Sequence, residues 1–343
     1  MITLLYQLFT NIAFAMNLQT EVIIPEQPFR INHKDKILLL GSCFAENIGN
    51  KLRESKFSID LNPFGTLYNA HSIGSAVSIL CGSKIYKEND LVERQGIYNS
   101  FDHHSRFSAT TAIDTLNLIN EQITVSRESL QSTQTVLITL GTRSIYKIKG
   151  EDRVVSNCHK FPEKSFDRYA CSCAEITEQC EQMLQQLWSI QPTMRVIFTV
   201  SPIRHWKDGA HENQLSKATL LLAIEAIQKQ YPQHITYFPA YEIVMDQLRD
   251  YRFYADDMIH PSTVAINYIW EQFKNSYFTK NTMEVIEQYT EIQKAINHKP
   301  FNPSSEQYHK FIMQTLLKVE QLKEKIPFFD LNNERMILTT KLH

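Results

Sequence analysis

The sequence predicts an α/β fold in which a parallel sheet carries helices on both faces. Three short apolar, β-branched runs have the composition of buried parallel strands, and they span residues 36–40, 135–140 and 195–200. Longer segments of helical periodicity lie between and after these runs. Strands that alternate with helices are typical of βαβ units, whose right-handed crossovers place helices on both sides of a sheet.

The first strand ends at Gly41, and a helix is expected to follow it at once. Phe44, Ile48 and Leu52 recur every four residues, which predicts an amphipathic helix with Ser42 as its N-cap. The remaining elements follow in order. Helices are expected over 174–191 and 213–231, and a short strand over 234–238.

Beyond about residue 277 the sequence becomes more polar. Two amphipathic helices are predicted over 281–299 and 305–325, with proline-containing pairs between them. We interpret them as an appended helical pair, either a lid over the sheet or a surface for a partner. The chain therefore divides into an N-terminal segment (1–19), a main domain (20–280) and a helical extension (281–343).

The composition excludes several classes of protein. Of the 343 residues, 43% are hydrophobic and 21% are charged, as in an average globular protein, so disorder is not the dominant state. The net charge of −2 argues against broad binding of nucleic acid or of anionic membranes. The six cysteines show no C-x-x-C spacing, which favours a reducing, cytoplasmic location without a zinc ribbon. We expect no metal and no cofactor.

The N-terminus requires a separate interpretation. Residues 1–15 are apolar and end in Ala-Phe-Ala, like a signal peptide, but no Lys or Arg precedes them. The segment is also too short to span a membrane, which takes about 20 residues. Met16 opens a segment that is typical of an ordinary protein start. We favour an over-extended start, with a weak export signal or a packed helix as alternatives.

In open α/β sheets, sites form at the carboxyl ends of the strands. Ser42 and Cys43 lie at the first such end, where a helix N-terminus stabilises negative charge. A thiolate benefits most from this position, so Cys43 is a candidate nucleophile, and Ser42 would need only a base. The alternative is purely structural, with Cys43 as a small core residue and Ser42 as a helix cap.

Asp257 and His260 are the candidate partners of that nucleophile. A carboxylate three residues before a histidine can accept from one imidazole nitrogen while the other nitrogen faces the nucleophile. The Asp-x-x-His pattern is weak by itself. Its occurrence in the last loop of a chain with a nucleophile at the first strand end makes it more specific.

Residues 41–45 spell Gly-Ser-Cys-Phe-Ala, the motif that names the GSCFA family, and the chain resembles that family over roughly residues 20–280. Further motifs agree in order, at residues 62–69, 140–142, 157–160, 201–205 and 257–261. The family resembles a branch of the SGNH (GDSL-like) hydrolases. The resemblance implies a three-layer, flavodoxin-like α/β/α fold and a reaction of ester hydrolysis or acyl transfer.

The resemblance also implies roles for individual residues. In SGNH enzymes the first motif is Gly-Asp-Ser, so Cys43 takes the place of the nucleophile, although a slip of one residue would select Ser42. Asp257 and His260 match the last motif. Gly65 resembles the glycine whose N–H helps to form the oxyanion hole, and Asn62 lies in the same motif.

The third SGNH motif, Gly-x-Asn-Asp, provides an asparagine that donates to the oxyanion. The corresponding residues here are Gly141-Thr142-Arg143-Ser144, so that asparagine is absent. The loss of one oxyanion donor can cost about 10²–10³ in rate. Asn157 or the guanidinium of Arg143 are the candidates to replace it.

Three further polar groups are candidates for the wall of the site. His104 could line it or bind a substrate anion, with a solvated loop as the alternative, and His159 accompanies Asn157. Arg204 and His205 follow the third strand, where substrate would lie, and Arg204 could bind a carboxylate or phosphate. Its alternative is a salt bridge in the wall.

The sequence thus predicts a hydrolase of esters or thioesters, acting on a small-molecule or carbohydrate-linked acyl ester. A transferase that uses the same acyl-enzyme remains open. A non-catalytic SGNH-like module that binds a ligand is the alternative from another class of protein.

Overall fold

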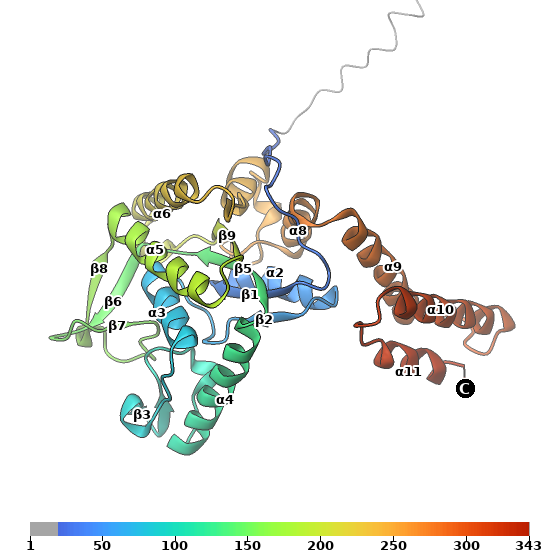
Figure 1. The fold of residues 1–343 in the computed structure, drawn as a ribbon, viewed down its shortest axis with the longest axis horizontal. Coiled ribbons are helices and arrows are strands. Elements are labelled where there is room, and N and C mark those ends of the chain that lie inside the picture. The colour runs from blue at the N-terminus through green and yellow to red at the C-terminus, as the bar shows by residue number, and fades with distance from the viewer. Residues whose placement is uncertain (1–19, 343) are drawn as a thin grey trace, which may run out of the picture.

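The computed structural model describes residues 20–342 and shows the predicted α/β fold (Figure 1). Five parallel strands form the central sheet in the order β10-β9-β5-β1-β2. Their bounds are β1 Lys36–Gly41, β2 Ile59–Leu61, β5 Thr133–Leu140, β9 Arg195–Val200 and β10 Ile235–Tyr237. Counted along the chain, these five strands have the order 2-1-3-4-5, which is the flavodoxin-like arrangement.

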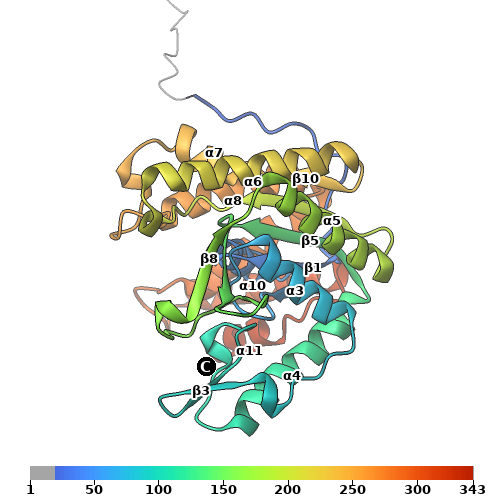
Figure 2. The ribbon, with the colours of Figure 1, turned by 90° about the vertical axis from the view of Figure 1, so that its left-hand side faces the viewer.

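Side chains of successive strand residues point to opposite faces, and each face is covered by helices. Leu38, Leu40 and Ile138 pack toward α3, α4, α5 and α6, whereas Leu39 and Leu137 pack toward α2 and α8. The bounds are α2 Cys43–Glu54, α3 Ala70–Cys81, α4 Ala112–Leu130, α5 Cys173–Ile190, α6 Ala210–Gln230 and α8 Thr263–Tyr277. Figure 2 looks onto the face with α3 and α5. The three-layer prediction is confirmed.

Two small antiparallel elements interrupt the βα alternation, and neither is predicted from the sequence. A hairpin precedes α4, and a three-stranded sheet in the order β7-β6-β8 lies between β5 and α5. Their bounds are β3 Val92–Arg94, β4 Ile97–Asn99, β6 Ser144–Ile148, β7 Val154–Val155 and β8 Phe166–Ala170. Strands of two to five residues carry too little hydrophobic periodicity to be recognised.

After β10 the chain forms a short helix, α7 (Ala240–Glu242), and one π-helical stretch. Helices α9 (Lys280–Asn297) and α10 (Glu306–Lys325) then occupy the segments predicted for the extension. A third helix, α11 (Asn332–Thr340), is unexpected because its nine residues make only about two and a half turns of periodicity. These three helices share an apolar cluster of their own.

The extension contacts the main body near the amino ends of the strands. Lys56, which follows α2, forms an ion pair of 2.9 Å with Glu334 of α11, and the His33 ring lies between Phe57 and Phe329. The carboxyl ends of the strands lie at the opposite edge of the sheet. The recorded contacts of the extension therefore lie away from the carboxyl ends of the strands.

Within residues 20–342, no helix has the length and apolar character needed to cross a lipid bilayer. The interpretation of the first 19 residues falls outside the described part of the chain.

Candidate active site

A cavity of about 440 Å³ opens at the carboxyl ends of β1, β5 and β9. Six residues expected from the sequence line it: Ser42, Cys43, Asn157, Arg204, His205 and His260. Residues to which the sequence assigned no individual role complete the wall, among them Tyr68, Asn69, Ser144, Arg168 and Asp208. The fold thus brings the first strand end and the last loop to one cavity.

Ser42 and Cys43 have different environments at the start of α2. Ser42 is the N-cap, only 2% exposed, and its Oγ accepts from the backbone N–H of Phe44 at 3.3 Å. Cys43 is the first helical residue and is half-buried. Its Sγ lies 3.7 Å from the hydroxyl of Tyr68. Burial, reinforced by the adjacent Cys43, raises the pKa of Tyr68, so this hydroxyl keeps its proton at neutral pH.

Asp257 and His260 form the predicted pair. The Asp257 Oδ2 accepts from the His260 Nδ1 at 2.5 Å, and its Oδ1 accepts from the backbone N–H groups of His260 and Ile259, each at 2.9 Å. These backbone donors, followed by the imidazole, lower the pKa of Asp257 to about 2, so the carboxylate is ionised at neutral pH. With Nδ1 engaged, Nε2 is the nitrogen left for the cavity.

Two asparagines present amide donors to the same cavity. The Asn69 Oδ1 accepts from the N–H of Ser72 at 2.8 Å and so caps α3. The Asn157 Oδ1 accepts from the N–H of His159 at 2.9 Å. Because each amide oxygen is already held, each Nδ2 is left to donate to a ligand. Asn69 carries a sequence signal as a helix N-cap, but that signal has no catalytic meaning by itself.

Arg204 and His205 lie in the cavity wall as expected. The Arg204 guanidinium lies about equally far from the rings of Trp206 and Tyr254, at 5.0 and 5.2 Å, and donates to the Met258 carbonyl at 3.0 Å. Burial lowers the pKa of His205 to about 4, so its ring is neutral at pH 7. Arg204 therefore connects the third strand end to the loop that carries His260.

Gly65 and Asn62 do not line the cavity. The Gly65 N–H donates to the Asn62 carbonyl at 2.6 Å, and its φ of +79° lets the backbone pack against the His104 side chain. The Asn62 Oδ1 accepts from the N–H of Gly41 at 2.9 Å, which supports the end of β1. With its N–H engaged, Gly65 does not offer the expected oxyanion donor in this structure.

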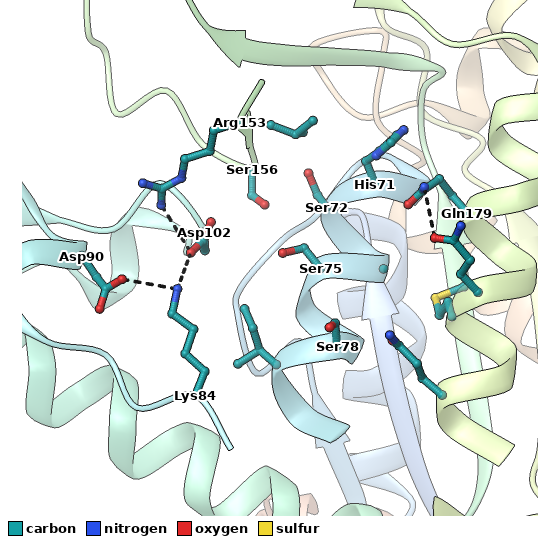
Figure 3. A pocket seen from close by; sticks show the side chains of 16 residues that line it. His71, Ser72, Ser75, Ser78, Lys84, Asp90, Asp102, Arg153, Ser156 and Gln179 are labelled. Atoms are coloured by element: carbon teal, nitrogen blue, oxygen red, sulfur yellow. Dashed lines mark hydrogen bonds and ion pairs between the residues drawn. The ribbon is translucent and has the colours of Figure 1, made fainter. Parts of the chain in front are cut away.

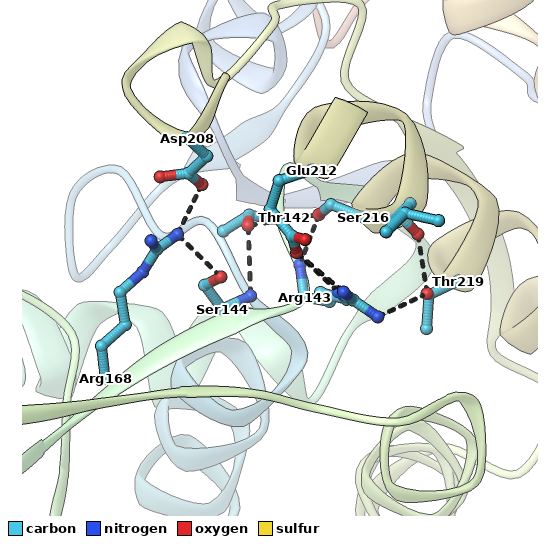
Figure 4. A network of polar contacts seen from close by, with 9 residues as sticks. Thr142, Arg143, Ser144, Arg168, Asp208, Glu212, Ser216 and Thr219 are labelled. Atoms are coloured by element: carbon cyan, nitrogen blue, oxygen red, sulfur yellow. Dashed lines mark hydrogen bonds and ion pairs between the residues drawn. The ribbon is translucent and has the colours of Figure 1, made fainter. Parts of the chain in front are cut away.

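Arg143, His104 and His159 are also directed elsewhere. The Arg143 guanidinium binds Glu212 of α6 at 2.7 Å, as Figure 4 shows. The His104 Nδ1 accepts from the backbone N–H of Arg106, and the His159 Nε2 bonds to the Ser100 carbonyl at 2.8 Å. None of the three lines the cavity, so Arg143 does not replace the missing asparagine.

The unpredicted sheet β6–β8 contributes one wall. Arg168 of β8 forms an ion pair of 2.5 Å with Asp208 and donates to the Ser144 hydroxyl at 2.9 Å (Figure 4). Asp208 lies in the loop after β9, so this pair joins the small sheet to the main one. The sequence offered no signal for it, because the strand that carries Arg168 was not recognised.

A buried lysine holds the strand ends together beneath the cavity. Lys217 of α6 is only 1% exposed, and its Nζ donates to the carbonyls of Gly141, Ser201 and Ile203 at 2.8, 2.7 and 3.0 Å. Burial lowers the pKa of Lys217 to about 7, whereas the three acceptors favour its charged form. It therefore fixes the ends of β5 and β9 relative to each other.

The described part of the chain contains no group of three or more His, Cys, Asp or Glu side chains arranged to hold a metal ion. All six cysteines are free thiols.

Comparison with known protein families identifies the family of this chain. The GSCFA family model matches residues 36–273, which is more than half of the chain. This chain belongs to the GSCFA family. The model described as "GSCFA domain protein, C-terminal domain" matches residues 289–343 of the same GSCFA chain.

Solved structures similar to the GSCFA chain include a carbohydrate esterase family 3 protein from Talaromyces cellulolyticus, with 11% identity and a TM-score of 0.33. A family 3 carbohydrate esterase from Clostridium thermocellum has 10% identity and the same TM-score. Each alignment covers 74% of this chain and 98% of the other. Likenesses this weak carry no information about activity. No curated protein matches the sequence.

Proposed function

We propose that this GSCFA protein cleaves an ester or thioester of a small or carbohydrate-linked acyl group, through an acyl-enzyme on Cys43. One observation carries the proposal. Cys43 and His260 line the same cavity, and the second nitrogen of His260 is bound to Asp257 at 2.5 Å. A nucleophile, a base and an orienting carboxylate are the three kinds of group that acyl transfer requires.

In the proposed reaction, the Nε2 of His260 takes the proton of the Cys43 thiol while the sulfur attacks the acyl carbon. The tetrahedral intermediate collapses, and the imidazolium returns the proton to the departing alcohol or thiol. Water then attacks the acyl-cysteine with His260 as the base, which releases the acid and restores the thiol. Asp257, ionised at neutral pH, holds the ring and stabilises the imidazolium.

The oxyanion would be held by one backbone donor and two side-chain donors. The Cys43 backbone N–H belongs to the first turn of α2, where N–H groups lack intrahelical acceptors. The Nδ2 groups of Asn69 and Asn157 are the side-chain donors in the same cavity. They take the role that the resemblance assigned to Gly65 and to the missing asparagine.

The environments of the two candidate nucleophiles favour the sulfur. The Ser42 hydroxyl is engaged in capping α2 and is buried, whereas the Cys43 thiol is half-buried and lies 3.7 Å from the Tyr68 hydroxyl. A helix N-terminus stabilises a thiolate directly. We further propose that residues 20–280 form the catalytic unit and that 281–343 form an attached helical unit.

The test uses the full chain with p-nitrophenyl acetate and an acetyl thioester. Cys43→Ala and His260→Gln are each expected to lower kcat/KM by about 10³ or more, because each removes a member of the reacting set. Cys158→Ala is the matched control, since Cys158 is another thiol in the same cavity wall. Trapping at low pH followed by mass spectrometry should place one acetyl group on Cys43.

Full turnover by Cys43→Ala would contradict the proposal, and so would an acetyl group found on Ser42. The absence of turnover in the parent chain for every ester and thioester, together with tight binding of an acyl ligand, would favour the binding module instead.

A further inference from the structure

A second cavity of about 590 Å³ lies beside the candidate active site, between α3 and α5. The α3 wall presents Ser72, Ser75 and Ser78, which share one helical face because they are three residues apart. Gln179, Gln182 and Gln186 of α5 line the other wall. Figure 3 shows Ser72 and Ser75 across the cavity from Asp102, with Ser156 beside Ser72. The volume of this second cavity lies within the range of small-molecule binding sites.

The two cavities adjoin. Ser156 lines both of them. Two segments of the chain also line both cavities. In residues 69–72, Asn69 lines the first cavity and Ser72 lines the second. In residues 154–157, Asn157 lines the first cavity and Val154 lines the second. A ligand that extends from Cys43 to the second cavity would pass Ser156.

The charged groups of the second cavity balance one another. Lys84 contacts Asp90 at 3.4 Å and Asp102 at 3.7 Å, and Arg153 contacts Asp102 at 3.5 Å (Figure 3). Burial lowers the pKa of His71, so this ring is neutral at pH 7. Two cations paired with two carboxylates leave no net charge to attract an ionic ligand, so the lining favours a neutral one.

At least one polar side chain of the second cavity has an unused hydrogen-bonding group. Ser72 is only 2% exposed, and its Oγ has no hydrogen-bond partner among residues 20–342. A buried hydroxyl in this state is costly unless a ligand or water satisfies it. The side chains described at this cavity include no Phe, Tyr or Trp, and its apolar members are Ile79, Val154 and Met183. The first cavity, by contrast, contains Tyr68, Tyr146 and Ile203.

We propose that the second cavity binds the neutral, hydroxyl-rich part of the substrate, a carbohydrate, while the acyl group occupies the first cavity. The assignment of the acyl group rests on the proposed function. The binding of the sugar does not, because it requires only the serine and glutamine walls.

The test measures binding of free neutral sugars to the full chain by saturation-transfer NMR, with glucose, galactose, xylose and N-acetylglucosamine as probes. We expect at least one to bind with a Kd of roughly millimolar order or tighter. Ser75→Leu and Gln182→Leu fill the cavity from opposite walls at exposed positions, and each should weaken that binding by about tenfold or more. Ser189→Leu, on an exposed position of α5 outside the cavity, should leave it unchanged.

The outcomes separate this inference from the proposed function. Ester cleavage by a chain that binds none of the four sugars would overturn the carbohydrate site and leave the hydrolase intact. Sugar binding that both leucine variants weaken would support the site even if no ester is cleaved. Binding insensitive to both variants, or tighter binding of inorganic phosphate that depends on Ser75, would overturn the inference.

Discussion

The hydroxyl of Tyr68 lies 3.7 Å from the sulfur of Cys43, and the backbone of the same tyrosine holds the neighbouring strand end. The Tyr68 carbonyl accepts from the N–H groups of Gly141 and Thr142 at 2.8 and 3.0 Å. One residue therefore connects the first strand end, where the proposed nucleophile lies, to the second. Since its pKa is raised, the phenol remains a donor toward a thiolate.

Tyr68→Phe is expected to lower kcat/KM for p-nitrophenyl acetate by about ten- to a hundredfold, because a hydrogen bond to a charged group contributes roughly 1.5–3 kcal/mol. Tyr146→Phe is the control, since Tyr146 lines the same cavity and has no contact with the sulfur among the described hydrogen bonds. Equal activities of the two variants would exclude a role for the Tyr68 hydroxyl.

Ser42→Ala should destabilise the protein and leave ester cleavage largely intact. The variant removes the oxygen that caps α2, which costs about 1 kcal/mol, while the sulfur stays in place. Thr111→Ala removes a comparable N-cap from α4, far along the chain, and should cost a similar amount in urea denaturation. Loss of turnover in the Ser42 variant alone would identify Ser42 as the nucleophile.

Asn69→Ser separates the two functions of Asn69. Serine is also a good N-cap, so the unfolding free energy should change little, but the Nδ2 donor is lost. We expect kcat to fall by about 10²-fold, as on removal of an oxyanion donor, with KM little changed. An unaltered kcat in steady-state kinetics would remove Asn69 from the oxyanion hole.

Lys217→Met should lower stability strongly. The substitution leaves three buried carbonyl oxygens without their donor, and we expect a loss of about 2–5 kcal/mol in urea denaturation. Lys207→Met, on the exposed side of the same region, should be almost neutral. A Lys217 variant as stable as the parent would show that the strand ends need no such clamp.

Stability should decline as the pH falls below about 6.5. Burial lowers the pKa of His33, His103 and His205 to about 4, 3 and 4, so the folded chain binds fewer protons than the unfolded chain between these values and 6.5. Their contribution is fully present above pH 6.5 and is lost on acidification, by up to about 1.4 kcal/mol per pH unit for each histidine.

Urea denaturation at pH 7 and pH 5 measures the slope of the unfolding free energy against pH. His33→Gln should flatten it, whereas His298→Gln, at an exposed position, should not. An unchanged slope for the His33 variant would show that His33 does not contribute to the acid sensitivity.

Local patterns were sufficient for the framework of the fold and for part of the site. The apolar runs of β1, β5 and β9 predict the strands correctly. The four-residue spacing of Phe44, Ile48 and Leu52 predicts helix α2 correctly. Each of these patterns lies within a single element, so the local sequence is sufficient. The placement of Cys43 at a helix start and of Asp257 beside His260 follows for the same reason. The short strands β6–β8 and helix α11 lie below the length at which periodicity is informative.

The rest of the site could not be predicted, because it depends on which distant groups form hydrogen bonds with each donor and acceptor. Gly65 aligned with the family glycine, and Arg143 was a candidate to replace the absent asparagine. In the folded chain the Gly65 N–H donates to Asn62, and the Arg143 guanidinium donates to Glu212, which is 69 residues away. Lys217, which lies in no motif, and Asn69, which lies in a motif without an assigned role, are directed to the strand ends and to the cavity. A side chain's type can be read from the chain, but its free hydrogen-bonding capacity exists only after folding has paired its neighbours.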